Sequence, residues 1–343
     1  MNDEFYIQRC INLALKGFGF VAPNPMVGAV IVYNNQIIGE GFHQIYGQSH
    51  AEVNAVYSVV DKSLLKESTI YVSLEPCSHF GKTPPCSDLL IHHQFKRVVI
   101  GCIDTFSEVS GKGIEKLQKA GIEVKIGVLE KECRALNKRF FTFHEKKRPY
   151  VILKWAQTKD GFIDRERTNG SKGINWITQP KTKKLVHQWR TEESSILIGK
   201  NTAIVDNPSL TVREFEGKNP IRIVLDSHLE TPNNATIFSN DAPTIIFNTI
   251  QSKEENNLKW IKVDQISPEI VLNQLYKLNI QSIIIEGGKQ TLDSFIDANL
   301  WDEARILIGT ENFSKGLIAP KLINQPTNTF KYGEDTVLII ENR

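Results

Sequence analysis

The stretches HAEVNA, His50 to Ala55, and YVSLEPCSHFGKTPPC, Tyr71 to Cys86, decide how the first part of this chain is interpreted. The first stretch opens a helical pattern with a histidine and places an acid two residues later. The second is an apolar strand pattern that ends at proline, followed by two cysteines with eight residues between them. A catalytic zinc site needs three such ligands and an open position for water. His50, Cys77 and Cys86 are therefore candidate ligands, and Glu52 is a candidate proton carrier.

Plainer interpretations of the same residues exist. An H-x-E triplet is common by chance, and a buried cysteine is usually a small apolar side chain. A structural zinc site would need a fourth ligand, which His43, His79, His92 or His93 could supply. The conjunction of HAE at a helix start with a strand that runs into EPC nevertheless favours a catalytic zinc of the deaminase type. The signature of that type is H-x-E followed by P-C-x-x-C, and here the second cysteine is displaced. The other cysteines, Cys10, Cys102 and Cys133, lie in apolar patterns and are expected in the core.

Working outward, strand and helix patterns alternate over residues 1–130 and predict an α/β/α layered domain. EFYIQRCINLALKGFG predicts a helix, and the apolar runs around Asn34–Asn35 predict a hairpin. EKECRALNKRFFTFHEKK predicts one closing helix, and the charged HEKKRP, ending at Pro149, is the candidate linker.

The alternation restarts at Tyr150. Strand patterns such as YVILKWAQT, SILIG, IRIVLD and QSIIIEGG, with helical patterns between some of them, predict a second α/β domain with a mostly parallel sheet. We expect domains at 1–146 and 147–343.

Composition limits the protein class and its surroundings. The chain has 343 residues, of which 41% are apolar and 23% charged, as in a folded globular protein. A formal charge of +2 does not favour nucleic acid as a partner. The polar start MNDEFYIQRC and the lack of a run of 18 apolar residues predict neither a secretory signal nor a membrane span. Five cysteines do not suggest a disulfide framework, so we expect a reducing, cytoplasmic location. The oligomeric state stays open, a homo-oligomer included.

A family resemblance accounts for the wide cysteine spacing. APNPMVGAVIV, GEGFH, GQSHAEVNA, YVSLEPCSHFGKTPPC and GKGIEKLQKAGIEV resemble the deaminase half of the bifunctional riboflavin-biosynthesis deaminase/reductases, in which a loop is inserted between the cysteines. The resemblance implies a cytidine-deaminase-like domain acting on a ribosylated pyrimidine phosphate. It also implies substrate contacts for Asn24, in a PNP turn that alone would be a plain turn, and for His79 and Lys82 in the inserted loop.

The second half resembles the reductase half of the same family. A G-x-G-x-x-G fingerprint is absent, and the strand-to-glycine turn IIIEGG alone is a weak phosphate-binding signal. RPYVILKWAQTKDGFID, NWIT, VHQWR and ILIGKNTAIVDNPSLTVR carry the resemblance, which implies a dihydrofolate-reductase-like domain that uses NADPH. The implied substrate contacts are Ile174, Arg190, Leu210, Arg213 and Glu286. The implied cofactor contacts are Ala156, Trp176, Thr202, Asp206, Ser227, Gly288, Lys289, Gln290, Thr291, Leu292, Asp293 and Ser294.

The reductase half departs from the family pattern in several places. QTKDG replaces Ser-Leu-Asp-Gly, Ile174 stands where serine is common, and Asn207 stands where aspartate is frequent. In the first half, IDTFSEVSGKG lacks the usual Asp-Pro-Asn-Pro turn. We therefore expect a two-step enzyme, with zinc-dependent deamination followed by reduction of the ribosyl group to ribityl. The alternatives are a deaminase with a non-reducing second domain and a zinc-stabilised binding protein, although the latter would have no use for Glu52.

Overall fold

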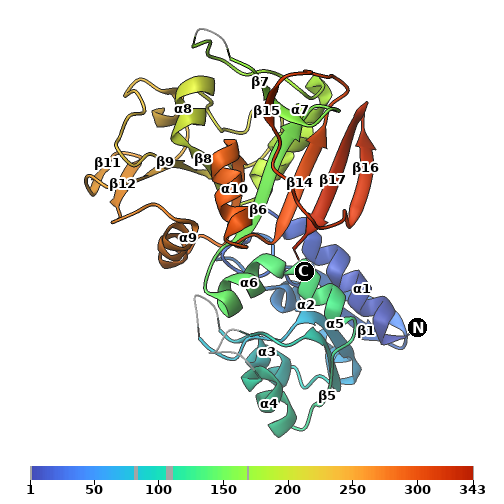
Figure 1. Cartoon of the computed structure of the whole chain (residues 1–343). Helices are drawn as coiled ribbons and strands as arrows, with labels where there is room; N and C mark the ends of the chain where they lie inside the picture. The colour runs from blue at the N-terminus through green and yellow to red at the C-terminus, as the bar shows by residue number, and fades with distance from the viewer. Residues whose placement is uncertain (1, 81–83, 106–110, 168–169, 343) are drawn as a thin grey trace. The chain divides into compact units, whose positions relative to one another are not determined.

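The computed structural model describes residues 2–80, 84–105, 111–167 and 170–342, and divides into two compact units (Figure 1). The units are Met1–Lys147 and Arg148–Arg343, and each has its own sheets and hydrophobic cores. No helix of the described residues has the length and apolar character needed to cross a membrane.

The first unit is built on a five-stranded sheet of order β2-β1-β3-β4-β5. Its strands are β1 (Gly28–Tyr33), β2 (Gln36–Phe42), β3 (Thr69–Leu74), β4 (Arg97–Cys102) and β5 (Glu123–Ile126). The predicted hairpin is confirmed, because Asn34 and Asn35 both adopt positive φ angles, 46° and 62°, between antiparallel β1 and β2. β3, β4 and β5 run parallel.

Helices cover both faces of this sheet, which confirms the predicted α/β/α layers. One core contains side chains of α1 (Asp3–Ala14), α5 (Glu130–Leu136) and α6 (Lys138–Lys146). The other contains side chains of α2 (Ala51–Ser58), α3 (Cys86–His92) and α4 (Lys112–Lys119). Gly39 and Gly41 let α2 lie directly on β2. A Cβ at Gly41, for example, would stand 2.3 Å from the backbone nitrogen of Ala55. This close packing fixes the start of α2, where His50 and Glu52 lie.

Two predictions concern the end of the first unit, and one of them is wrong. The single closing helix is broken into α5 and α6 at Asn137, whose amide side chain bonds both backbone groups of Met26 at 2.8 and 2.9 Å. The proposed linker HEKKRP contains the boundary between the two units, which lies between Lys147 and Arg148, although α6 continues into it as far as Lys146. Phe140, Phe141 and Phe143 bury one face of α6 and so stabilise this charged segment as helix.

The second unit contains a ten-stranded, mostly parallel sheet, as predicted. Its order is β11-β12-β10-β9-β8-β13-β6-β14-β17-β16, and the pairs from β12 to β14 are parallel. The predicted strands are β6 (Tyr150–Gln157), β8 (Ser195–Gly199), β9 (Ile221–Leu225), β10 (Thr244–Asn248), β13 (Ser282–Gly287) and β14 (Glu303–Ile308). The strands absent from the prediction are β7 (Phe162–Arg165), β11 (Lys253–Glu255), β12 (Leu258–Lys262), β15 (Gly316–Ile318), β16 (Asn328–Tyr332) and β17 (Asp335–Glu341).

Helices again cover both faces of the large sheet. α7 (Pro180–Glu192) and α8 (Lys200–Asp206) contribute to one core, and α9 (Pro268–Lys277) and α10 (Lys289–Asp297) to the other. α8 was not predicted. It directly follows β8, as α10 follows β13 after Gly288, so both helices start at the carboxyl ends of parallel strands.

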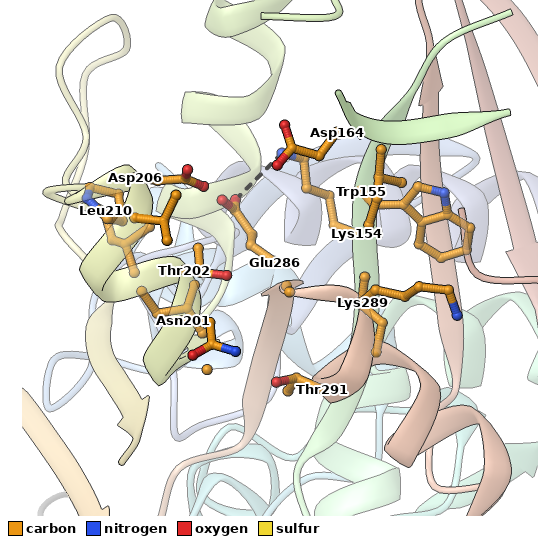
Figure 2. A pocket seen from close by; sticks show the side chains of 18 of the residues that line it. Lys154, Trp155, Asp164, Asn201, Thr202, Asp206, Leu210, Glu286, Lys289 and Thr291 are labelled. Atoms are coloured by element: carbon orange, nitrogen blue, oxygen red, sulfur yellow. Dashed lines mark ion pairs between the residues drawn. The ribbon is translucent and has the colours of Figure 1, made fainter. Parts of the chain in front are cut away.

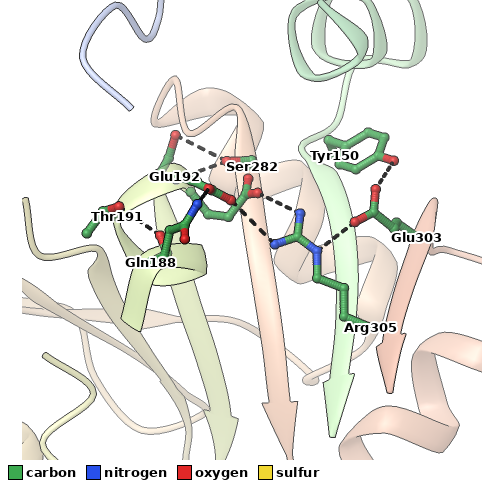
Figure 3. Close-up of polar contacts among 9 residues, drawn as sticks. Tyr150, Gln188, Thr191, Glu192, Ser282, Glu303 and Arg305 are labelled. Atoms are coloured by element: carbon green, nitrogen blue, oxygen red, sulfur yellow. Dashed lines mark hydrogen bonds and ion pairs between the residues drawn. The ribbon is translucent and has the colours of Figure 1, made fainter. Parts of the chain in front are cut away.

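A buried polar cluster lies where β6, β8, β13 and β14 begin (Figure 3). Its centre is Arg305, whose guanidinium is 2.6 Å from Glu303 and 3.2 Å from Glu193. Tyr150 donates a hydrogen bond to Glu303 at 3.1 Å, and Ser282 accepts one from the backbone N–H of Ser194 at 2.9 Å. These contacts join the end of α7 to the first residues of the central strands.

Candidate active sites

The three predicted metal ligands meet at one point of the first unit. Pro85 precedes α3, so Cys86 is the first residue of that helix, while His50 is the residue before α2 and Cys77 follows β3. The Nδ1 atom of His50 lies 3.6 Å from Sγ of Cys77 and 3.4 Å from Sγ of Cys86, and all three ligand atoms lie within 4.8 Å of one another. Zinc–sulfur and zinc–nitrogen bonds of about 2.3 and 2.05 Å at a tetrahedral angle would separate S and N by about 3.6 Å. The geometry therefore fits a tetrahedral zinc ion with three protein ligands.

The neighbours of Cys77 favour the thiolate form of this ligand, whereas the neighbouring Cys77 and burial raise the pKa of Cys86. The backbone N–H of Cys86 donates to Sγ of Cys77 at 3.3 Å. The hydrogen bond from Cys86 outweighs burial and, together with His50, holds the pKa of Cys77 at about 4. A thiolate is the form that binds zinc.

Glu52 lies in the first turn of α2 and is 3% exposed. Burial, together with the neighbouring Cys77, raises the pKa of Glu52 to about 7. A bound divalent cation would lower this value. Glu52 is not among the three side chains whose ligand atoms converge. A buried carboxylate beside a metal site is suited to accept and return a proton.

Asn24 is connected to the metal site through His43, which the sequence suggested only as a possible fourth ligand of a structural zinc site. Nε2 of His43 lies 3.1 Å from Nδ2 of Asn24, and its Nδ1 lies 3.0 Å from the backbone oxygen of Ser49. Nδ1 therefore carries the proton, and Nε2 accepts from the amide of Asn24. The His43 ring also packs edge-on against His50 at 5.4 Å. The amide oxygen of Asn24 remains available as an acceptor on this group.

The inserted loop contains the other two expected substrate contacts. His79 lies two residues after Cys77 and is half-buried. Lys82 lies outside the described residues.

The second candidate site is a cleft of about 1530 Å³ in the second unit. Ligand pockets commonly measure about 300–1,000 Å³, so this cleft has room for a dinucleotide and a substrate together. All the reductase residues expected from the sequence line it: Ala156, Ile174, Trp176, Arg190, Thr202, Asp206, Leu210, Arg213, Ser227, Glu286, Gly288, Lys289, Gln290, Thr291, Leu292, Asp293 and Ser294.

A buried carboxylate with two cations lies at the centre of the cleft. Glu286, near the end of β13, accepts hydrogen bonds from Arg190 at 2.9 and 3.3 Å and lies 3.8 Å from Nζ of Lys154 (Figure 2). Burial alone would raise the pKa of Glu286, but Arg190 and Lys154 outweigh it and hold that pKa at about 2. Burial lowers the pKa of Lys154, and Glu286 partly offsets this effect. Lys154 can thus donate a proton more readily than an exposed lysine.

Sequence reasoning did not find Lys154. It is a single cation in the otherwise apolar strand pattern YVILKWAQ, and this was the signal available.

Two arginines offer cationic groups to the same cleft in different ways. Arg190 has five N–H donors. Two of them donate to Glu286 and one to the backbone oxygen of Thr211, so two donors remain for a ligand in the cleft. Arg213 is exposed, and its Nη1 donates to the hydroxyl groups of Ser209 and Thr211. Its guanidinium lines the cleft and donates to hydroxyl groups there, which suits a phosphate.

The rim of the cleft is apolar on one side. Ile174 and Trp176 are 45% and 58% exposed, and Nζ of Lys183 lies 3.8 Å from the Trp176 ring centroid. Arg167, which precedes these two residues in the chain, forms ion pairs with Asp164 of β7 and with Asp206, the latter at 3.4 Å. Burial raises the pKa of Asp206, and Arg167 opposes that shift. The loop next to the cleft is therefore tied to a residue of α8.

Comparison with protein families matches each unit to a different family model. Residues 1–102 match the cytidine and deoxycytidylate deaminase zinc-binding region. Residues 149–311 match the RibD C-terminal domain.

Comparison with whole proteins finds relatives that have both units. The riboflavin biosynthesis protein RibD of Aquifex aeolicus is 41% identical and covers 92% of this chain and 89% of its own. RibD of Escherichia coli is 35% identical, with coverages of 94% and 89%. A crystal structure of a diaminohydroxyphosphoribosylaminopyrimidine deaminase/5-amino-6-(5-phosphoribosylamino)uracil reductase from Thermotoga maritima is 37% identical, with a TM-score of 0.89 and coverages of 99% and 98%. RibD of Acinetobacter baumannii is 30% identical, with the same TM-score and coverages.

Proposed function

The chain belongs to the RibD family of bifunctional riboflavin-biosynthesis enzymes, and on that premise we propose which of its residues carry each of the two reactions. The enzyme deaminates a diamino-ribosylaminopyrimidinone phosphate and then reduces its ribosyl group to ribityl with NADPH. Both a zinc-binding deaminase unit and a reductase unit are present, so the alternative of a deaminase alone is not needed. We assign deamination to residues 1–146 and reduction to residues 147–343.

For deamination, we assign His50, Cys77 and Cys86 as the residues that hold zinc. The bound Zn²⁺ supplies the Lewis acid that makes water nucleophilic at neutral pH. Glu52 takes the proton of the attacking water and returns it to the departing amine, so that ammonia leaves. The convergence of the three ligand atoms with Glu52 buried beside them is the observation that carries this assignment.

Substrate orientation in the first unit is assigned to Asn24, His79 and Lys82. Asn24 accepts a hydrogen bond from the pyrimidine, because His43 occupies its amide N–H at 3.1 Å and so orients its oxygen. His79 and Lys82 in the inserted loop are assigned to the substrate phosphate or base.

For reduction, we assign the cleft of the second unit to both ligands. Bound NADPH supplies the hydride. The cofactor contacts are Ala156, Trp176, Thr202, Asp206, Ser227 and the segment Gly288 to Ser294. Glu286, Arg190, Leu210 and Ile174 contact the substrate, and Arg213 binds its phosphate. Lys154, beside Glu286, is positioned to donate a proton as the ribose ring opens.

The two assignments are separated by one variant assayed for both reactions. Glu52→Gln should keep its zinc, because Glu52 is not a ligand, yet ammonia release should fall by about 10²–10⁴-fold. NADPH oxidation with the deaminated intermediate should be unchanged. Equal loss of both activities would show that the two sites do not act independently. Full ammonia release by the variant would remove Glu52 from the mechanism.

Two further properties, the location and the class of partner, are proposed from composition. The five cysteines are free, and thiolate ligands persist in a reducing compartment, which supports a cytoplasmic location. The near-neutral formal charge of +2 supports small molecules rather than nucleic acid as partners.

A further inference from the structure

The carboxyl ends of β13, β8 and β9 are neighbours along the edge of the sheet that forms the cleft. β13 ends in the glycine turn at Gly287, and β9, two strands away, ends at Leu225. Adjacent strands are about 4.8 Å apart, so the end of β9 lies about 10 Å from the glycine turn. In open α/β sheets a dinucleotide lies along this edge. With its diphosphate on the glycine turn and α10, the cofactor extends its adenosine ribose toward the end of β9.

The acid at the end of β9 is not available to that ribose. In other dinucleotide-binding folds an acid near such a strand end accepts a hydrogen bond from the ribose 2′-hydroxyl, which suits NADH. Asp226 is 1% exposed, and its two oxygens accept from the backbone N–H groups of Glu230 at 3.0 Å and Thr231 at 2.8 Å. Its carboxylate therefore closes the turn 226–231.

The side chains that line the cleft at this place are cationic or neutral donors. Lys200, just after β8, and Ser227 and His228, just after β9, all line the cleft. Glu230 is not among the lining residues, and it accepts from Nζ of Lys200 at 2.7 Å and lies 3.6 Å from Nδ1 of His228. Lys200 and His228 therefore lie close to each other, because both contact Glu230.

We propose that Lys200 and His228 bind the 2′-phosphate of the cofactor, with Ser227 as a third donor, and thereby make the reductase prefer NADPH to NADH. The positions of the cationic side chains support separate sites for the cofactor 2′-phosphate and the substrate phosphate. The reaction brings two phosphomonoesters into one cleft, and Arg213 lies beside His187 of α7, whereas Lys200 and His228 follow β8 and β9. Each phosphate then has its own donors. This inference rests on the proposed position of NADPH along the glycine turn.

The test compares the two cofactors in the intact enzyme. Kd for NADPH and for NADH is measured by equilibrium titration, and kcat/KM for each is measured with the deaminated intermediate. The variants are Lys200→Gln, His228→Gln and the double variant. A charge-assisted hydrogen bond contributes about 1.5–3 kcal/mol, so Lys200→Gln should weaken NADPH by about 10–150-fold and NADH by less than about 3-fold. The double variant should bring the two Kd values together.

Controls separate the possible outcomes. Lys259→Gln removes an exposed lysine that pairs with Glu254 on the β11–β12 edge and should change neither Kd. Adenosine 2′,5′-bisphosphate should compete with NADPH in the unmutated enzyme and lose its advantage over AMP in Lys200→Gln. Equal weakening of NADPH and NADH, or no weakening, would overturn the assignment. An unmutated enzyme that binds NADPH but does not oxidise it would instead refute the reductase function.

Discussion

Arg190→Met should destabilise the second unit, because it leaves a carboxylate buried without its main partner. The side chains of Arg190 and Glu286 are 11% and 9% exposed, and their atoms lie 2.9 Å apart. Removing one partner of a buried ion pair costs about 3–5 kcal/mol. Lys154 remains 3.8 Å from Glu286, so we expect the lower end, about 3 kcal/mol. For a unit of this size, 1 kcal/mol shifts Tm by about 2–4 °C, so the melting temperature should fall by about 6–12 °C.

The chain offers a selective probe for this measurement. All five tryptophans, Trp155, Trp176, Trp189, Trp260 and Trp301, belong to the second unit, so urea unfolding followed by tryptophan fluorescence reports that unit alone.

The double variant Arg190→Met/Glu286→Gln should be less destabilised than the sum of its single variants, because the unpaired charge is gone. Lys259→Gln, at an exposed pair, should change stability by less than about 1 kcal/mol. Zinc content, a property of the first unit, should not change. A loss below about 1 kcal/mol for Arg190→Met would refute the electrostatic argument.

Three further changes test other parts of the two sites. Cys77→Ser should lose most of the roughly one zinc per chain expected from a three-ligand site, as measured by elemental analysis of purified protein; full zinc retention would contradict the ligand set. Arg213→Ala should raise KM for the deaminated intermediate by about one to two decades, with kcat and NADPH affinity near normal, because a phosphate contact is made equally in ground and transition states. A weaker NADPH affinity with an unchanged substrate KM would assign Arg213 to the cofactor instead. Burial, with Arg190 and Arg213, lowers the pKa of His187 from 6.5 to about 4, so its neutral ring contributes stability that is present above pH 6.5 and lost as pH falls toward 4. His187→Gln should therefore flatten the stability profile of the second unit between pH 6.5 and 4, and an unchanged slope would show that His187 is not its source.

The sequence predicted those features in which residue type and local spacing carry the physics. Two asparagines, which tolerate positive φ, marked the hairpin, and three metal-binding side chains around a helix start and a strand end marked the zinc site. Features that depend on distant contacts were not readable. Asn137 breaks a helical pattern because it bonds Met26, 111 positions earlier.

The sequence also failed to predict elements that are short or that lack a clear apolar face. β11 is the charged triplet Lys253–Glu255, which has no apolar side chain to bury, and α8 has only seven residues and no side-chain cap. The position of Lys154 opposite Glu286 depends on the pairing of β6 with β13, and no local pattern contains that information.

The polar cluster around Arg305 also determines which alignment of the central strands is the native one. Side chains alternate between the two faces of a strand, so a slip of β14 by one residue would place Glu303 and Arg305 in the core now filled by Ala304 and Ile306. Such a slip would move a strand by about 3.3 Å and turn its side chains to the opposite face. β6 is paired to β14 on one side and to β13 on the other, and it carries Lys154 four residues beyond Tyr150. The ion pairs of Arg305, where the central strands begin, thus disfavour misaligned pairings that would move Lys154 away from Glu286, where β13 ends.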